Sequence, residues 1–214
     1  MVSILLLVVI YMSFISLGLP DSMLGAAWPM IYPTIGADVS MAGFISMTAC
    51  IGTVISSLSF SKIARRFSTR VITAFSIFVT SFALFLMSKA TSIYMMLPIS
   101  LLLGLGGGCV DSALNNYVSL HYSTGAMSFL HGFWGVGTTI GPILLGILIP
   151  LGYTWRTGYV SLSAIQGVIL ILSLLAFPLW KIKEKEYKKE GVSEDDIKVV
   201  STKEAIKRNG AIFA

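Results

Sequence analysis

Charge is scarce over most of this sequence. Charged residues make up 12% of the chain and hydrophobic residues 55%, whereas soluble domains average about 25% charged residues. Between residues 1 and 180 the only acidic side chains are Asp21, Asp38 and Asp111. This composition excludes an ordinary soluble domain and predicts a protein embedded in a membrane.

The sequence also lacks the residue patterns of enzymes, metal sites and disulfide frameworks. Cys50 and Cys109 both lie in apolar segments, where cysteine behaves as a small buried hydrophobe. The two histidines and the aspartates are too scattered for a metal site, and no catalytic triad, phosphate loop or dinucleotide loop can be assembled. We therefore expect no enzyme activity, no cofactor and no metal.

What charge there is gathers in short loops and near the end of the sequence. Residues 181–208 hold seven acidic and nine basic side chains, so the formal net charge of +5 does not describe a nucleic-acid-binding surface. Mixed charge of this kind is typical of a solvated helix or linker. A basic membrane-surface helix is the alternative, but the seven acids argue against it.

Six apolar segments are long enough to span a bilayer, which takes about 20 residues as a helix. They cover residues 3–31, 39–60, 70–88, 92–120, 126–151 and 158–180. Strands of a barrel would alternate apolar and polar residues, and these segments do not. The sequence predicts an all-α membrane protein with a six-helix transmembrane domain over 1–180, a charged linker over 181–208 and the start of a truncated seventh helix at 209–214.

The distribution of lysine and arginine predicts the orientation. With the N-terminus inside, the cytoplasmic side holds thirteen basic residues, namely the loop residues Lys62, Arg65, Arg66 and Arg70 and nine in the tail. The outside holds Lys89 and Arg156. Basic residues favour the cytoplasmic side in short loops. We expect a multi-pass plasma-membrane protein whose N-terminus and tail are cytoplasmic.

The first predicted span contains an acid beside a proline. A carboxylate within a bilayer costs about 2.5–3.5 kcal/mol and usually lines a polar path or carries protons. Pro20 removes an amide donor, and Gly18, Asp21, Gly25 and Trp28 recur at helical spacing on one expected face. Asp21 and Trp28 thus suit a polyol or sugar site. The alternative is that Asp21 caps a broken half-helix and Trp28 anchors at the outer interface.

The fourth span carries Asp111 and Asn115, which lie four residues apart and share a face with Gly104 and Gly108. The glycines are expected to serve close helix packing. Within the spans Asp111 has no evident basic counter-ion, and unpaired burial favours the neutral acid. Such a carboxyl can load and release a proton. A protonated Asp111 that simply bonds a neighbouring helix is the alternative.

The fifth and sixth spans add further candidates for contact with a polar solute. His131, Trp134 and Thr138 form a stripe, and Gln166 is a weaker candidate for the same cavity. Histidine titrates in the physiological range. His131 can equally be an interfacial hydrogen-bonding residue, so both interpretations stay open.

Several segments together resemble the major facilitator superfamily and, within it, the sugar-transporting branch that includes the fucose permeases. They are Gly-Leu-Pro-Asp-Ser-Met-Leu-Gly at 18–25, Gly-Gly-Gly-Cys-Val-Asp-Ser-Ala-Leu-Asn-Asn-Tyr at 106–117, Ser-Phe-Leu-His-Gly-Phe-Trp-Gly at 128–135 and the cytoplasmic Lys-Ile-Ala-Arg-Arg-Phe at 62–67. The resemblance implies that Asp21 and Asp111 serve proton coupling and sugar binding, and that His131 lies near the sugar. This chain departs from the family pattern at Asp111, where those permeases carry Glu, and at Ser61 and Ser68 in the loop.

Members of this superfamily consist of two six-helix halves with the pocket between them, and the chain resembles the N-terminal half. We expect a second half as partner, supplied by the same gene product or by another chain; the abrupt end at Ala214 favours a fragment. The leading hypothesis is a secondary transporter of a small polar solute, with sugars the favoured class, coupled to protons by alternating access. The alternatives are an uncoupled facilitator and an inactive half that serves only helix packing or assembly.

Overall fold

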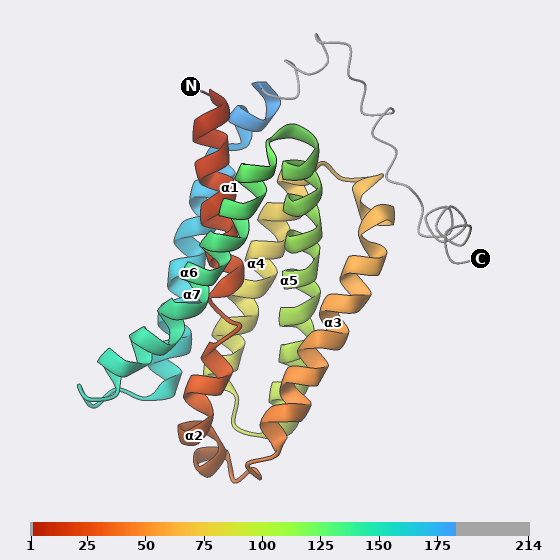
Figure 1. Ribbon diagram of the computed structural model, residues 1–214. Helices are drawn as coiled ribbons and strands as arrows, with labels where there is room; N and C mark the ends of the chain where they lie inside the picture. Colours follow the sequence, from red (N-terminus) through yellow and green to blue (C-terminus); the bar gives the residue numbers. More distant parts are fainter. Residues whose placement is uncertain (1, 183–214) are drawn as a thin grey trace.

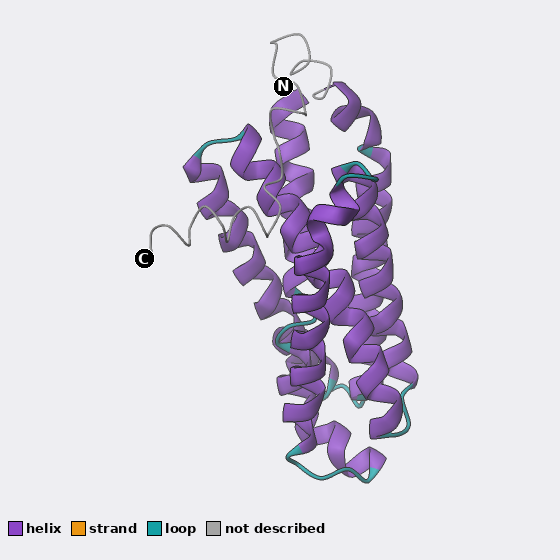
Figure 2. Ribbon diagram, turned by 90° about the vertical axis from the view of Figure 1, so that its right-hand side faces the viewer, coloured by secondary structure: helices purple, strands orange, loops and turns teal. Residues whose placement is uncertain are grey.

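The computed structural model describes residues 2–182, and these residues form long helices joined by short turns, without a strand (Figure 2). The helices are α1 (Val2–Gly18), α2 (Met23–Ile35), α3 (Met41–Ala64), α4 (Thr69–Lys89), α5 (Ile93–His121), α6 (Thr124–Leu148) and α7 (Trp155–Leu175). After a turn at Ala176 the chain is helical again as far as residue 182. The predicted all-α fold is confirmed. The predicted linker and seventh helix lie outside the described residues, apart from positions 181 and 182.

Within that range, six segments are long and apolar enough to cross a bilayer. They are Ile4–Ile35, Met41–Ala64, Thr69–Lys89, Ile93–His121, Thr124–Leu148 and Trp155–Ile182. The number of predicted spans is therefore confirmed. The first span differs most from its prediction, because it is built from two helices, α1 and α2, with an interruption between them.

The two ends of the bundle differ in charge. The start of α1, the α3–α4 turn and the end of the described chain lie at one end of the bundle (Figure 1). Lys62, Arg65 and Arg66 are exposed at that α3–α4 turn. Lys89 is the last residue of α4 and Arg156 lies in the first turn of α7, both at the opposite end. Among the described residues, the α3–α4 turn therefore holds more basic side chains than the turns at the opposite end.

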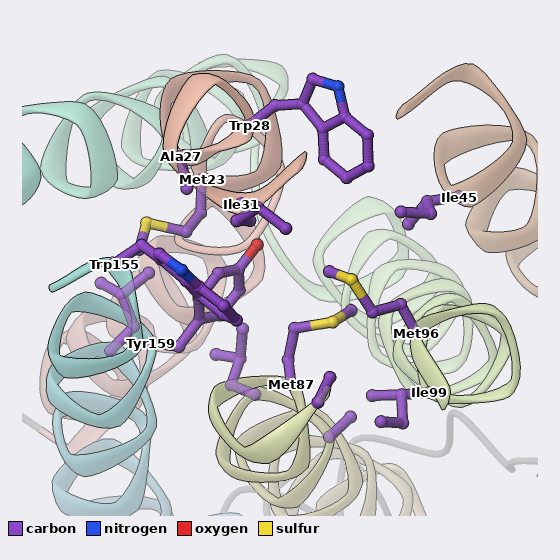
Figure 3. Packing of buried hydrophobic residues seen from close by; sticks show 14 of the residues in the cluster. Met23, Ala27, Trp28, Ile31, Ile45, Met87, Met96, Ile99, Trp155 and Tyr159 are labelled. Atoms are coloured by element: carbon purple, nitrogen blue, oxygen red, sulfur yellow. The ribbon is translucent and has the colours of Figure 1, made fainter. Parts of the chain in front are cut away.

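Two clusters of buried apolar side chains fill the bundle on either side of the α1–α2 interruption. One includes Leu19 and Met23 and continues to Trp28, Met87 and Tyr159 near the end opposite the N-terminus (Figure 3). The other surrounds α1 and includes Leu6, Phe14, Leu114, Leu130 and Trp180. The interruption includes Leu19, which is fully buried in the first cluster, and Asp21, which is exposed.

Glycine allows the backbones of α5 and α3 to approach closely at two positions of their crossing. A Cβ atom added to Gly104 would meet the carbonyl of Ala49 on α3, and one added to Gly108 would meet Ser56 and Thr53. Close approach of this kind is a common way to pack helices in lipid. The prediction that these glycines serve packing is confirmed.

Polar side chains also join helices away from the interruption. The Ser163 hydroxyl on α7 donates to the carbonyl of Ser81 on α4 at 2.8 Å, and the Ser81 hydroxyl donates back to the Ser163 carbonyl at 3.0 Å. At the opposite end from the N-terminus, Arg156 donates to the carbonyls of Ser88 and Ala90 at 2.8 and 2.7 Å. These bonds fix α7 against α4.

Candidate functional site

The interruption of the first span begins at a proline. Pro20 has no backbone N–H, so the carbonyl of Ser16, four residues earlier, loses its usual helical donor. The Asp21 amide turns instead to the Gly18 carbonyl at 3.2 Å, and the Met23 amide turns to the Pro20 carbonyl at 3.2 Å. The helix stops at Gly18 and restarts at Met23, leaving Asp21 exposed near the middle of the span.

The expected common face of Gly18, Asp21, Gly25 and Trp28 is wrong, because the helix does not continue through the interruption. Gly18 is buried, whereas Asp21 and Gly25 are exposed. Trp28 is only 6% exposed and belongs to the cluster shown in Figure 3. Its indole N–H donates to the carbonyl of Val39 at 2.8 Å. Trp28 therefore ties α2 to the loop before α3.

Helix α6 holds the interrupted segment in place. The Trp134 indole Nε1 donates to Asp21 Oδ2 at 2.8 Å. The Ser22 hydroxyl donates to the carbonyl of Thr138, one turn further along α6. A Cβ atom at Gly18 would collide with the Trp134 carbonyl, so the two backbones are in close contact there. Asp21 is consequently presented on the α6 side of the span.

Helix α5 supplies the second carboxyl group. The Asn115 Nδ2 atom donates to Asp111 Oδ1 at 2.8 Å and to the Asp111 backbone carbonyl at 3.0 Å. Both residues are half-buried. The predicted shared face of Asp111 and Asn115 is confirmed. Asp111 also lies within range of charge interaction with His131 of α6 and with Asp21.

Aromatic rings adjoin these polar groups. The His131 ring is exposed and meets the edge of Phe14 at 5.9 Å between ring centroids. Tyr11 of α1 stacks on Phe133 of α6 at 4.8 Å and donates to the carbonyl of Ala126 at 3.1 Å. The imidazole of His131 thus contacts an aromatic ring of α1, and a second aromatic pair joins α1 to α6.

The structure therefore brings together five of the predicted site residues from three spans. They are Asp21, Asp111, Asn115, His131 and Trp134, each exposed or half-buried. Carboxylates accept hydrogen bonds, the amide and indole donate them, and imidazole can do either. Such a set can bind a solute with several hydroxyl groups and can also hold a proton.

Two predicted site residues lie elsewhere. Trp28 is packed in the cluster described above, and Gln166 is fully buried between α7 and α1. Whether either residue touches a solute stays a prediction. Sequence reasoning missed Ser22 and Phe14, although Ser22 follows Asp21 directly and its hydroxyl was available as a signal.

Comparison with known proteins identifies the family to which this chain belongs. The sequence model described as Major Facilitator Superfamily matches residues 10–214. This chain belongs to that superfamily. Its members are membrane transporters, so the chain is an integral membrane protein of a transport family, and its six spans are consistent with one half of the major facilitator fold. A search of curated proteins finds no match.

Proposed function

We propose that this major facilitator protein is a proton-coupled secondary transporter of a small polar solute, with sugars the favoured class and the fucose permeases the branch it resembles. The observation that supports this proposal most is that the carboxyl groups of Asp21 and Asp111 lie within range of charge interaction. Asp21 lies between α1 and α2 and is exposed, whereas Asp111 lies on α5 and is half-buried. Acidic residues inside membranes commonly mark substrate and proton pathways.

The neighbouring groups suit a solute rich in hydroxyls. Asp21 and Asp111 can accept hydrogen bonds from hydroxyl groups, while the imidazole of His131 can donate one. Trp134 is 40% exposed, and its ring offers apolar surface to the carbon face of a sugar. These features favour a neutral polyhydroxylated solute over a strongly charged one.

Protonation would provide the coupling. With both carboxyl groups ionised, moving this surface through a closed, water-poor state carries the cost of burying charge. Loading a proton on Asp111, together with Asp21, removes that charge, and the loaded carrier can then reorient. Release of the proton on the other side restores the charged form and holds the carrier open until solute or proton binds again.

The proposal also includes a partner half and an orientation in the membrane. A second six-helix half, from the same gene product or another chain, would close the open surface and complete the pocket. We place the protein in the plasma membrane with Lys62, Arg65, Arg66 and Arg70 on the cytoplasmic side, together with the N-terminus and tail. These basic residues would then help fix the orientation.

The test is solute-induced proton movement in cells that express the protein from its own genomic locus. A panel of hexoses, deoxyhexoses, polyols and neutral amino acids is added to lightly buffered cells while the external pH is recorded. A transported sugar should raise the external pH and should accumulate, and a protonophore should abolish the accumulation. Uptake that a protonophore leaves unchanged would instead identify an uncoupled facilitator. No uptake of any compound would favour the inactive assembly module.

A further inference from the structure

Gln166 forms a hydrogen bond at the position where the first span lacks one. The residue lies on α7 and is 0% exposed. Its Nε2 atom donates to the carbonyl oxygen of Ser16 at 2.6 Å. In an unbroken helix that carbonyl would accept the backbone N–H of residue 20, which here is a proline. The side chain of one span therefore supplies the donor that another span has lost.

The need for such a donor is physical. Backbone carbonyls in a bilayer find no water in the hydrocarbon region, so those freed by a proline are satisfied by neighbouring helices or side chains. The backbone amide of Leu19 is already used by the Ile15 carbonyl at 3.1 Å, and that of Asp21 by the Gly18 carbonyl. The amide of Gln166 is the donor that reaches Ser16 from outside the span.

The other end of the Gln166 side chain adds no second hydrogen bond in the described structure. In the described part of the chain its Oε1 atom has no hydrogen-bond partner, although it is buried. A buried amide with one unsatisfied end is unfavourable on its own account. The bond to Ser16 is thus the interaction through which Gln166 acts in this structure.

The bond lies directly before the segment that presents Asp21. Ser16 is two residues before the end of α1, where Gly18 contacts α6 and the chain leaves the helical path. Asp21 follows, with its carboxylate bonded to Trp134. Holding the last turn of α1 therefore also sets the direction in which the interruption leaves it.

We propose that Gln166 is a positioning residue that replaces the hydrogen bond removed by Pro20 and so fixes the interruption that sets Asp21 against Trp134. The inference rests on the proposed role of Asp21 in proton coupling. Gln166 acts through Ser16 and touches neither the solute nor the transferred proton. Contact of Gln166 with the solute is the competing outcome of the experiment below.

The experiment is a double-mutant cycle in the full chain. Q166L removes the donor with little change in side-chain volume, and P20A restores a backbone N–H that can reach the Ser16 carbonyl. The matched control is S163A, which removes a hydrogen bond between α7 and α4 one turn away from Gln166. Each substitution is made with Pro20 present and in the P20A background.

The first readout is thermal unfolding of the purified protein in detergent, which does not depend on transport. Q166L should lower the unfolding midpoint when Pro20 is present and should have little effect in the P20A background. S163A should lower the unfolding midpoint by the same amount with Pro20 present and in the P20A background. If Q166L alone does not accumulate in the membrane, the P20A/Q166L variant should restore accumulation. An equal effect of Q166L in both backgrounds, or no restoration, would overturn the inference.

The second readout is the ratio of proton-driven accumulation to equilibrium exchange. Misplacing a working group by about 1 Å can cost ~100-fold. We expect Q166L, like D21N, to lower this ratio about tenfold or more, whereas S163A should lower both rates by the same factor. A rise in KM with an unchanged ratio would identify Gln166 as a solute contact. If D21N and D111N leave accumulation intact while the unfolding cycle behaves as expected, the proposed function has failed and Gln166 only stabilises the interruption.

Discussion

The Trp134 indole donates a hydrogen bond to the Asp21 carboxylate at 2.8 Å, between residues 113 apart in the sequence. Trp134 lies on α6, and Asp21 lies in the interruption between α1 and α2. The bond joins a carboxylate inside a membrane span to a rigid donor on a neighbouring helix. It defines the direction in which Asp21 presents its second oxygen, so both the solute and the proton should depend on it.

Replacement of Trp134 by phenylalanine should therefore weaken transport. A hydrogen bond to a charged group contributes about 1.5–3 kcal/mol, and each 1.4 kcal/mol corresponds to about tenfold in affinity. We expect W134F to raise the KM of solute uptake about tenfold or more, with the protein still inserted. The measurement is initial uptake against solute concentration. An unchanged KM would show that the indole N–H has no part in binding.

The variant W28F, matched to W134F, distinguishes two roles for Trp28: tying α2 to the following loop and contacting the solute. The structure places this indole against the carbonyl of Val39 and within an apolar cluster. Loss of that neutral bond should lower stability by about 0.5–1.5 kcal/mol. If Trp28 only ties α2 to the following loop, W28F lowers the thermal midpoint and leaves KM unchanged. If it contacts the solute, KM rises as well.

The sequence predicted the six spans because composition and length suffice for that purpose. It also predicted that Asp111 and Asn115 share a helix face, since residues four apart on a helix are neighbours. The sequence did not predict on which side of the span Trp28 lies, because the helical spacing was counted through Pro20 as if the helix were continuous. Contacts such as Gln166 with Ser16 join residues 150 apart and depend on how α7 packs against α1. Periodicity within one helix contains no information on such contacts.

The contact between α1 and α6 should be sensitive to a single methyl group. A Cβ atom at Gly18 would collide with the Trp134 carbonyl and would lie 2.9 Å from the Thr138 nitrogen, both backbone atoms that cannot rotate away. Overpacking typically costs about 1–3 kcal/mol. We expect G18A to lower the thermal midpoint and to reduce transport.

Gly25 provides the matched control for Gly18. It lies in the same span, and a Cβ atom there would meet nothing within 4 Å. G25A should therefore unfold at the same temperature as the unsubstituted protein or slightly above it. Equal destabilisation by G18A and G25A would show that the α1–α6 contact is not the cause.

Asp38, in the loop between α2 and α3, should contribute a small pH-dependent stability. The Ser40 hydroxyl donates to its carboxylate at 2.6 Å and the Ser40 backbone N–H at 2.8 Å. These two hydrogen bonds hold the pKa of the Asp38 carboxyl below its ordinary value, and the bond from the Ser40 hydroxyl has the larger effect. A lowered pKa in the folded state gives stability that is present above the unfolded pKa and is lost as pH falls through the folded pKa.

The variant D38A should therefore unfold at a lower temperature than the unsubstituted protein at pH 6. The difference should shrink as pH falls below about 4, where aspartate in an unfolded chain becomes protonated. S40A should show the same pH dependence with a smaller difference. A difference between D38A and the unsubstituted protein that stays constant down to acidic pH would contradict the linkage.

Proton-driven accumulation by the D111N variant decides whether Asp111 carries the proton that is coupled to transport. Asparagine keeps the size of Asp111 and an oxygen that can accept the hydrogen bond from Asn115, but it cannot bind or release a proton. The ratio of internal to external solute is measured under an imposed pH gradient, alongside exchange of labelled solute without a gradient. The account predicts that D111N loses accumulation and retains part of the exchange. Uphill accumulation equal to that of the unsubstituted protein would contradict it.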